Sequence, residues 1–181
     1  VIPERLAPVL AEVRPLAARF EEAGHRVSLV GGIVRDLVLG RPLSGDIDLT
    51  TDARPEETVA VAKGWADAIW DQGARFGTIG LKRGDTTFEV TTHRAEAYSA
   101  DSRKPEVSFA SDVEADLSRR DFTVNAMALR VTGAAGEEPE LIDPFGGVAD
   151  LAAGVLRTPL SPEESFTDDP LTECPQCQGR L

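Results

Sequence analysis

The sequence has no long hydrophobic run and very little cysteine. No apolar stretch comes near the roughly 20 residues that a membrane-spanning helix needs, and the first residues lack the basic-then-apolar pattern of a secretory signal. Both cysteines, Cys174 and Cys177, lie in the last eight residues, which excludes a disulfide framework in the body of the chain. We therefore expect a cytoplasmic protein that does not contact a membrane.

Positive charge is also scarce. The 181 residues include 19 Lys and Arg against 31 Asp and Glu, a formal net charge of -12. Because binding to nucleic-acid phosphates needs clustered lysine and arginine, this balance argues against a general nucleic-acid-binding surface. Any contact with RNA must be local, through metal ions and a few arginines, or be made by chain outside this sequence. The length, the 41% hydrophobic content and the lack of internal repeats indicate one folded domain.

One stretch, from Leu29 to Thr51, carries the first sign of a nucleotide-handling enzyme. It reads LVGGIVRDLVLGRPLSGDIDLTT, in which an apolar strand ends in Gly31 and Gly32 and a short helical pattern comes next. A glycine pair at such a junction lets a phosphate approach backbone N–H groups at the start of the helix. Glycine pairs are common in turns, so this one gains its weight from the acidic strand that comes after the helix.

That acidic strand, DIDLT, belongs to the same stretch. Residues two apart on a strand point to the same face, so Asp46 and Asp48 share one side, and the apolar Ile47 and Leu49 share the other. Two carboxylates together on a half-buried strand are costly unless a cation lies between them. The pair therefore predicts a divalent-metal site, and a metal site beside a glycine turn is typical of phosphoryl-transfer enzymes.

Arginines at two places suit a triphosphate. Arg35, one turn into the helix after the glycines, either grips a triphosphate or makes a surface ion pair. Arg119 and Arg120 stand in the segment SRRDFTVNAMAL together with Asn125, whose amide suits a ribose hydroxyl. The alternative for these two arginines is an ion pair with Asp116 or Asp121.

A third carboxylate is predicted in a hairpin. Two runs rich in β-forming residues, 78–83 and 86–92, flank a Gly-Asp turn, which is typical of a β-hairpin. Glu89 stands between two apolar residues of the second run, so it faces away from both. It joins the metal carboxylates if its strand pairs beside DIDLT; otherwise it is a surface glutamate.

The remaining pattern places other elements around these strands. Helical spacing covers residues 3–22, where Pro15 is expected to kink or split the helix. The same spacing covers residues 55–72, whose tryptophans are expected to belong to the core rather than to a stacking surface. A polar stretch at 98–111 predicts a loop, and 155–158 predicts a last strand.

Five segments succeed one another as in a known family: GGIVRDLVLGRPLSGDIDLTT, FEVTTHRAE, LSRRDFTVNAMAL, LIDPFGGVADL and SFTDDPL. From Leu29 to Leu171 the chain resembles the head domain of class II tRNA nucleotidyltransferases. That family comprises the CCA-adding enzymes and the bacterial poly(A) polymerases, within the polymerase-beta nucleotidyltransferase superfamily. The resemblance implies an α+β fold with a mixed, mostly antiparallel sheet flanked by helices. It implies a head domain over residues 1–171, in which the helix at 3–22 precedes a motif core at 26–158.

The resemblance also implies an activity and its residues. Nucleotides pass from ATP or CTP to the 3′ end of tRNA, which is bound mainly by chain regions absent from this sequence, and no obligate protein partner is implied. Mg²⁺ is held by Asp46 and Asp48, and Glu89 matches a third catalytic position. The nucleotide-binding positions that the resemblance implies are Gly31, Gly32, Arg35, Arg120, Asp121, Asn125 and Asp169.

The chain departs from the family pattern after Leu171. Residues 172–181 read TECPQCQGRL, where the family continues into the neck helix that selects the incoming base. One C-x-x-C pair cannot supply the four ligands of a structural zinc site. We therefore expect weak nucleotide binding and poor base discrimination. Three interpretations stay open, namely CCA addition, poly(A) addition with ATP alone, and non-catalytic nucleotide binding.

Overall fold

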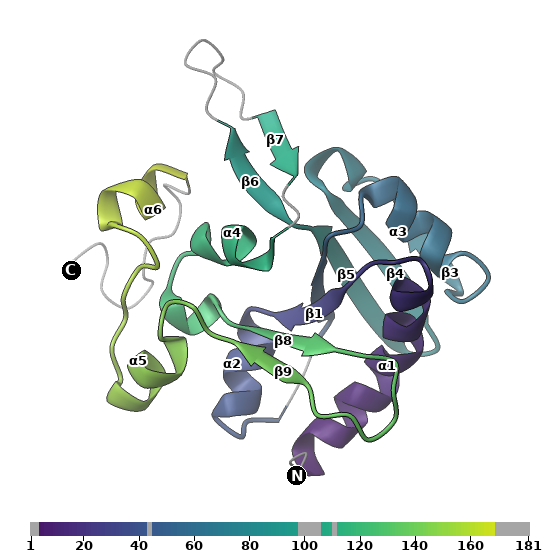
Figure 1. Ribbon diagram of the computed structural model, residues 1–181, viewed down its shortest axis with the longest axis horizontal. Coiled ribbons are helices and arrows are strands. Elements are labelled where there is room, and N and C mark those ends of the chain that lie inside the picture. The colour runs from purple at the N-terminus through teal and green to yellow at the C-terminus, as the bar shows by residue number, and fades with distance from the viewer. Residues whose placement is uncertain (1–3, 43–44, 98–105, 110–111, 169–181) are drawn as a thin grey trace.

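The computed structural model describes residues 4–42, 45–97, 106–109 and 112–168, and it shows an α+β fold built on one large sheet (Figure 1). The strands are β1 (Val27–Val30), β2 (Ile47–Thr51), β3 (Ala68–Trp70), β4 (Thr78–Arg83), β5 (Thr86–Thr92), β6 (Arg94–Ala97), β7 (Glu106–Phe109), β8 (Ala128–Val131) and β9 (Glu140–Ile142). The α-helices are α1 (Ala7–Glu22), α2 (Gly32–Val38), α3 (Pro55–Ala62), α4 (Val113–Ser118), α5 (Gly147–Ala153) and α6 (Pro162–Asp168). The 3-10 helices are η1 (Glu4–Leu6), η2 (Ala74–Phe76) and η3 (Thr123–Asn125).

The large sheet has seven strands in the order β3-β4-β5-β2-β1-β8-β9. Its neighbouring strands are antiparallel except β2 and β5, which run parallel. The strands β6 and β7 form a separate antiparallel pair, which extends away from the large sheet at the top of Figure 1. The predicted fold class, with a mixed and mostly antiparallel sheet, is confirmed, and so is the hairpin of β4 and β5.

The inner face of the large sheet carries the main core. The helices α1 and α3 pack against each other; α1 also contacts β8, and α3 contacts β4 and β5. The apolar side of α1, with Val13, Leu16 and Phe20 fully buried, belongs to one cluster with Leu49 and Val90 from the middle of the sheet. Each such buried side chain stabilises the fold by about 1.5–3 kcal/mol, so α1 is an integral part of this domain.

The outer face of the sheet has a smaller core over its β1 and β8 half. That cluster is supplied by α4 and by the segment that leads into β8, and it consists of Val30, Val113, Leu117, Ala126 and Ala128. On the β4 and β5 half of the same face, Lys82 and Glu89 are exposed. The outer face is therefore divided into a covered half and an open half.

Helix α1 runs without a break through Pro15, so the predicted split does not occur, whereas the alternative of a kink stays a prediction. Pro15 lies on the exposed side of the helix, and the carbonyl group of Ala11, which a proline four residues later cannot bond, is on an exposed residue that solvent can reach. The regular helix begins at Ala7, later than predicted, because residues 4–6 form a 3-10 turn. Gly24, with a φ of +82°, comes just after the end of the helix.

The helix predicted over residues 55–72 is also wrong in its second half. Helix α3 ends at Ala62, because the next residue is extended and Gly64 adopts a φ of +79°. The chain then enters the edge strand β3. Trp65 is in the core with 8% of its surface exposed, as predicted, whereas Trp70 is 39% exposed on β3, so the prediction fails for Trp70.

Two predictions further along the chain are corrected as well. Residues 106–109 form β7 inside the predicted loop 98–111, of which 98–105 and 110–111 lie outside the described residues. Residues 155–158 do not form a strand. The carbonyl of Arg157 accepts one bond from the backbone N–H of Thr123, which ties this segment to η3 without forming a ladder.

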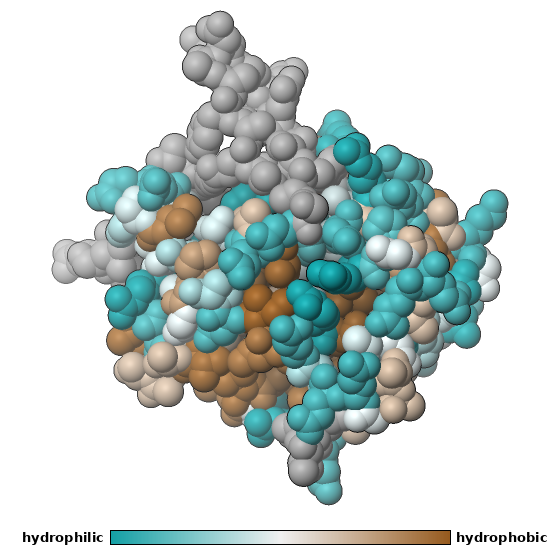
Figure 2. All heavy atoms as spheres, in the orientation of Figure 1, coloured by the Kyte–Doolittle hydropathy of each residue, from teal (hydrophilic) through white to brown (hydrophobic). Residues whose placement is uncertain are grey.

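Within the described ranges, no helix is both long enough and apolar enough to cross a membrane. Figure 2 shows apolar side chains gathered below the centre of one face of the molecule, over α2 and β9. Leu39, at the end of α2, and Leu141, in β9, are exposed large apolar residues in these elements.

Candidate active site

Asp48 and Glu89 lie side by side in the large sheet. The parallel register of β2 and β5 places them directly opposite each other, on strands that are about 4.8 Å apart. Asp48 is half-buried and Glu89 is exposed. The strand of Glu89 thus pairs beside DIDLT, which is the condition for its predicted place beside the two aspartates.

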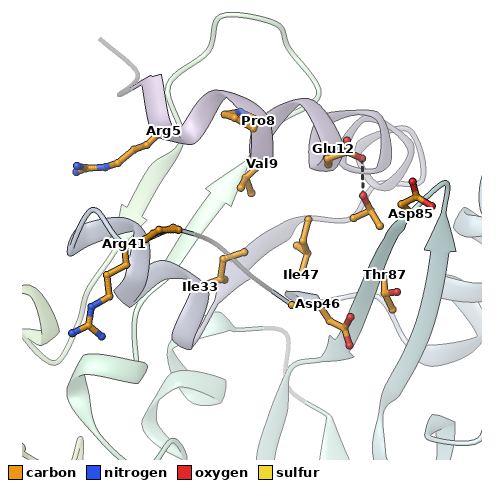
Figure 3. Close-up of a pocket in the computed structure, with 13 residues that line it drawn as sticks. Arg5, Pro8, Val9, Glu12, Ile33, Arg41, Asp46, Ile47, Asp85 and Thr87 are labelled. Atoms are coloured by element: carbon orange, nitrogen blue, oxygen red, sulfur yellow. Dashed lines mark hydrogen bonds between the residues drawn. The ribbon is translucent and has the colours of Figure 1, made fainter.

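Asp46 immediately precedes the first residue of β2 and lines a cavity. The cavity has a volume of about 680 Å³ and lies between α1, the start of β2 and the hairpin of β4 and β5 (Figure 3). Asp46 and Thr87 line one side of it, and Arg5 and Arg41 lie toward the other end. Asp46 is exposed, so solvent and ligands have access to its carboxylate.

The surroundings of Asp48 raise the pKa of its carboxyl group. Burial is the largest cause, the charge of Glu89 comes next, Arg120 acts in the opposite direction, and Asp46 adds a smaller increase. A carboxylate whose charged form is disfavoured in this way is stabilised by a nearby cation. The site therefore has the electrostatic character of a cation site.

A complete protein cage for a metal is not present in the described part of the chain, where no three Asp, Glu, His or Cys side chains cluster closely enough to hold an ion. Mg²⁺ does not need such a cage, because it commonly uses one or two carboxylates and takes its other ligands from water and substrate phosphates. The pair Asp46 and Asp48, with Glu89 beside it, fits that kind of site.

The glycine turn lies against Arg120. Gly31 immediately precedes α2 and has a φ of +77°, which favours glycine. A β-carbon built on Gly31 would lie 3.0 Å from Nη1 of Arg120 and would press on the guanidinium group. The turn after β1 and the segment SRRDFTVNAMAL, which are far apart in the sequence, therefore meet at this point.

Arg35 forms a second link between the same two segments. Its Nη1 donates to Oδ1 of Asn125 at 2.9 Å, and its Nε donates to Oδ1 of Asp36 at 3.0 Å. The amide nitrogen of Asn125 in turn donates to Oδ1 of Asp121 at 3.0 Å. Arg35 thus has the ion pair that the sequence left open, and it also contacts another predicted nucleotide-binding residue.

Asp116 was not predicted as a site residue, although it holds Arg120. Nη2 of Arg120 lies 3.3 Å from Oδ2 of Asp116, so the ion pair considered as an alternative is present. Asp116 is buried, and it also accepts the backbone N–H of Arg94 at 3.2 Å. The hydroxyl of Thr50 lies 3.5 Å from Asp116 and 2.8 Å from Nδ1 of His93. The only signal in the sequence was the four-residue spacing of Asp116 and Arg120 on one helical face.

Two other predicted positions are Gly32 and Asp169. Gly32 is the first residue of α2, and a β-carbon there would lie 3.4 Å from Nη2 of Arg35. Asp169 and the residues 172–181 lie outside the described ranges. The structure therefore brings the glycine turn together with Arg120 and Arg35, and Arg35 with Asn125, and the charge of Arg120 acts on Asp48.

Comparison with known families agrees with this arrangement. The model of the family described as the Poly A polymerase head domain matches residues 27–157, from β1 to the segment after α5. The chain belongs to this family. This head domain is similar to the CCA-adding enzyme of Lactobacillus delbrueckii subsp. bulgaricus, with 39% identity over 168 residues, and to that of Bacillus subtilis, with 40% identity over 164 residues. Nucleotidyltransferases of the CCA-adding type are generally metal-dependent.

The alignments take in most of this chain and a minor part of each relative. They cover 92% and 90% of this chain, but only 40% and 38% of the two relatives. The chain therefore spans about two fifths of the length of the curated proteins it matches.

Solved structures give the same result. The Bacillus stearothermophilus CCA-adding enzyme in complex with CTP superposes with a TM-score of 0.73 at 32% identity, over 94% of this chain and 37% of that one. The Thermotoga maritima CCA-adding enzyme complexed with tRNA gives a TM-score of 0.68 at 32% identity, over 90% of this chain and 35% of that one. The head domain thus shares its fold with these nucleotidyltransferases.

Proposed function

We propose that this head domain transfers nucleotides from CTP and ATP to the 3′ end of tRNA, the reaction named for its CCA-adding relatives. One observation carries the proposal, namely the position of Arg120. Its guanidinium group lies against the glycine turn at Gly31, and its charge acts on the pKa of Asp48. A triphosphate held at the turn would therefore have its reacting end next to the carboxylates.

Asp46 and Asp48 would hold Mg²⁺, with Glu89 beside them. When bound, this ion supplies Lewis-acid activation of the RNA 3′-hydroxyl and of the α-phosphate. The residues of the chain position the reactants around it. The 3′-oxygen forms a bond to the α-phosphorus while the bond to the bridging oxygen of the β-phosphate breaks, so pyrophosphate leaves and the hydroxyl proton passes to solvent.

Arg35 and Arg120 would offset the charge of the β- and γ-phosphates. Because Arg35 now donates to Asn125, we expect it to exchange that acceptor for a phosphate oxygen when a nucleotide binds. The amide oxygen of Asn125 is then free to accept a hydrogen bond from a ribose hydroxyl, while the amide nitrogen still donates to Asp121. Gly31 and Gly32 would leave the backbone of the turn open to the phosphates, and Asp169 is proposed to contact the base.

The test is incorporation of labelled nucleotide by the purified 181-residue chain. A tRNA lacking its CCA end is incubated with Mg²⁺ and with labelled CTP or ATP, and the products are separated on a sequencing gel. We expect metal-dependent extension that is lost in the Asp46→Asn variant. An absence of extension at enzyme excess, or extension that this variant leaves unchanged, would refute the proposal.

Poly(A) addition is the second candidate, and the description of the matching family favours it. The four nucleotides supplied one at a time separate the two activities. Repeated addition of adenylate from ATP alone, with no incorporation of cytidylate, would replace the CCA-adding assignment with a poly(A) polymerase.

A further inference from the structure

Trp70 stands in a row with the two facing carboxylates of the sheet. The registers pair Trp70 with Gly80, Gly80 with Glu89, and Glu89 with Asp48. Residues paired directly across neighbouring strands point to the same face of a sheet. The four residues therefore form a line across the outer face, from the edge strand β3 to β2. Three steps between strands separate Trp70 from Asp48, which is about 14 Å.

The indole of Trp70 lies on Gly80. A β-carbon built on Gly80 would be 3.1 Å from Cε3 of Trp70 and 3.5 Å from its Cβ, so the ring occupies the space that a side chain at this position would fill. Trp70 still has 39% of its surface exposed. Because Gly80 has no side chain, the aromatic ring of Trp70 can pack directly on the backbone of the sheet, and part of the residue stays exposed to solvent.

The second tryptophan of this region shows what an ordinary core position looks like. Trp65 is 8% exposed and packs against Phe88, with the ring centroids 5.6 Å apart. Phe88 neighbours Glu89 in β5 and therefore points to the inner face. Trp65 belongs to the main core, whereas Trp70 is outside both clusters of buried residues.

The position of Trp70 relative to the candidate nucleotide-binding residues indicates which of the two substrates it would contact. Gly31 and Arg35 come after β1, and Arg120 precedes β8, so they lie on one side of β2 in the strand order. Trp70 lies on the opposite side, beyond β5 and β4. In an in-line transfer the attacking hydroxyl and the leaving pyrophosphate are on opposite sides of the α-phosphorus. If the triphosphate occupies the β1 and β8 side, the RNA must approach over β5, β4 and β3.

The open half of the outer face also carries a positive charge. Lys82 lies two residues after Gly80 and pairs with Thr87, so its side chain points to the same face as Trp70. Lys82 is exposed. On the edge side Lys82 pairs with Ala68, two residues before Trp70, so the lysine lies diagonally from the tryptophan on this face. Aromatic faces combined with basic side chains are the usual means of binding single-stranded nucleic acid.

We propose that Trp70, seated on Gly80, is a stacking platform for an unpaired base of the RNA acceptor strand, and that Lys82 contacts the backbone of that strand. The proposal rests on the proposed function, because it takes the RNA to be the substrate that approaches Asp48 and Glu89. A base that stacks on Trp70 would hold the 3′ end of the strand over the carboxylates. Stacking on an aromatic ring accepts any base, so this contact positions the acceptor without selecting its sequence.

Binding is tested first, by tryptophan fluorescence, with a short single-stranded oligocytidylate as the probe. The Trp65→Phe variant leaves Trp70 as the emitter, and the Trp70→Phe variant leaves Trp65. We expect the oligonucleotide to quench most of the emission of the first variant and almost none of the second. Should Trp65→Phe not fold, the difference in quenching between the wild-type chain and Trp70→Phe gives the same information. If the oligonucleotide does not change the emission of Trp70, the proposed stacking platform is refuted.

Kinetics test the role in the reaction. Trp70→Ala should raise the KM for the RNA acceptor about tenfold, the loss expected for one stacked base, while the KM for nucleotide stays unchanged. Trp70→Phe retains a ring and should remain within about threefold of the wild-type KM. An unchanged KM for RNA in Trp70→Ala refutes the inference, whereas a wild-type chain that never extends RNA refutes the proposed function. The quenching experiment needs no catalysis, so the two failures are distinguishable.

Discussion

Glu89 lies directly opposite Asp48 in the parallel register of β2 and β5, and its charge helps to raise the pKa of Asp48. A carboxyl group whose folded-state pKa is raised stabilises the fold only at acid pH, and this contribution is lost as the pH rises through that pKa. At neutral pH the pair therefore lowers the free energy of unfolding. A bound cation would offset this cost, which links the stability of the domain to metal binding.

Replacing Asp48 by Asn removes the repelled charge and keeps the shape of the side chain. We expect the thermal midpoint at neutral pH to rise by about 3 °C, while nucleotide transfer falls by roughly a thousandfold or more. Added Mg²⁺ should raise the midpoint of the wild-type chain and not that of Asp48→Asn. The same substitution at Asp85, an exposed residue of the β4 and β5 turn, is the control and should change neither quantity. Wild-type transfer by Asp48→Asn would contradict the metal assignment.

Gly31 and Gly24 form a matched pair for testing the contact with Arg120. Both have a positive φ, +77° and +82°, so alanine is strained at either position. Nothing lies within 4 Å of a β-carbon at Gly24, whereas one at Gly31 would press on Arg120. Gly24→Ala should lower the free energy of unfolding by about 1 kcal/mol. Gly31→Ala should lower it by about 2–3 kcal/mol, because its ψ of -139° lies in a region that essentially only glycine adopts. Urea denaturation measures both values.

Only the alanine at Gly31 should affect the nucleotide. We expect Gly31→Ala to raise the KM for CTP by about tenfold, because the guanidinium group is displaced from the phosphates. Gly24→Ala should keep the wild-type KM. Equal KM values for CTP in the two variants would show that the position of the Arg120 guanidinium group does not depend on the space left by Gly31.

Asp116 is expected to act on the nucleotide through Arg120. Asp116→Asn keeps an acceptor for the backbone N–H of Arg94 but removes the charge that holds the guanidinium group. Steady-state kinetics should show a KM for nucleotide raised about fivefold, with the KM for RNA unchanged. Glu140→Gln, which breaks the ion pair of Arg130 and Glu140 at the edge of the sheet, is the control and should leave both constants unchanged. A nucleotide KM that Asp116→Asn does not alter would mean that Arg120 is positioned by other contacts.

His93 makes the stability of the domain depend on pH. Burial lowers the pKa of His93; the charges of Asp116, Asp52 and Asp112 act in the opposite direction, and Arg130 adds to the lowering. The unfolded chain therefore takes up a proton near pH 6.5 more readily than the folded chain does. Stability is fully retained above that pH and falls as the pH is lowered below it.

Urea denaturation at a series of pH values measures this effect. The free energy of unfolding of the wild-type chain should fall between about pH 6.5 and pH 5, and the fall should become smaller in His93→Gln. An identical slope in His93→Gln and in the wild-type chain would assign the pH dependence to other groups.

Much of the site was predictable because its components are local. The alternation of side chains along a strand placed Glu89 opposite to its apolar neighbours, and the glycine pair marked the turn before α2. The apolar spacing of α1 identified its buried side, even though Pro15 misled the prediction of its continuity. These features depend on residues a few positions apart, so the order of residue types carries them.

Long-range packing determined the rest. Side-chain periodicity gives the face of a strand but not its neighbour, so only the folded chain places β5 beside β2 and Arg120 against Gly31. Asp116 and Arg120 are four residues apart, a spacing that is common in helices. Asp116 joins the candidate site because it is buried and forms an ion pair with Arg120 in the folded chain. Trp70 lies in a stretch that was predicted to be a core helix, but the turn at Gly64 and the pairing of β3 with β4 place it on the open face. The sequence thus determines locally which residues are candidates for the site, whereas the packing of the core determines which of these candidates lie next to one another.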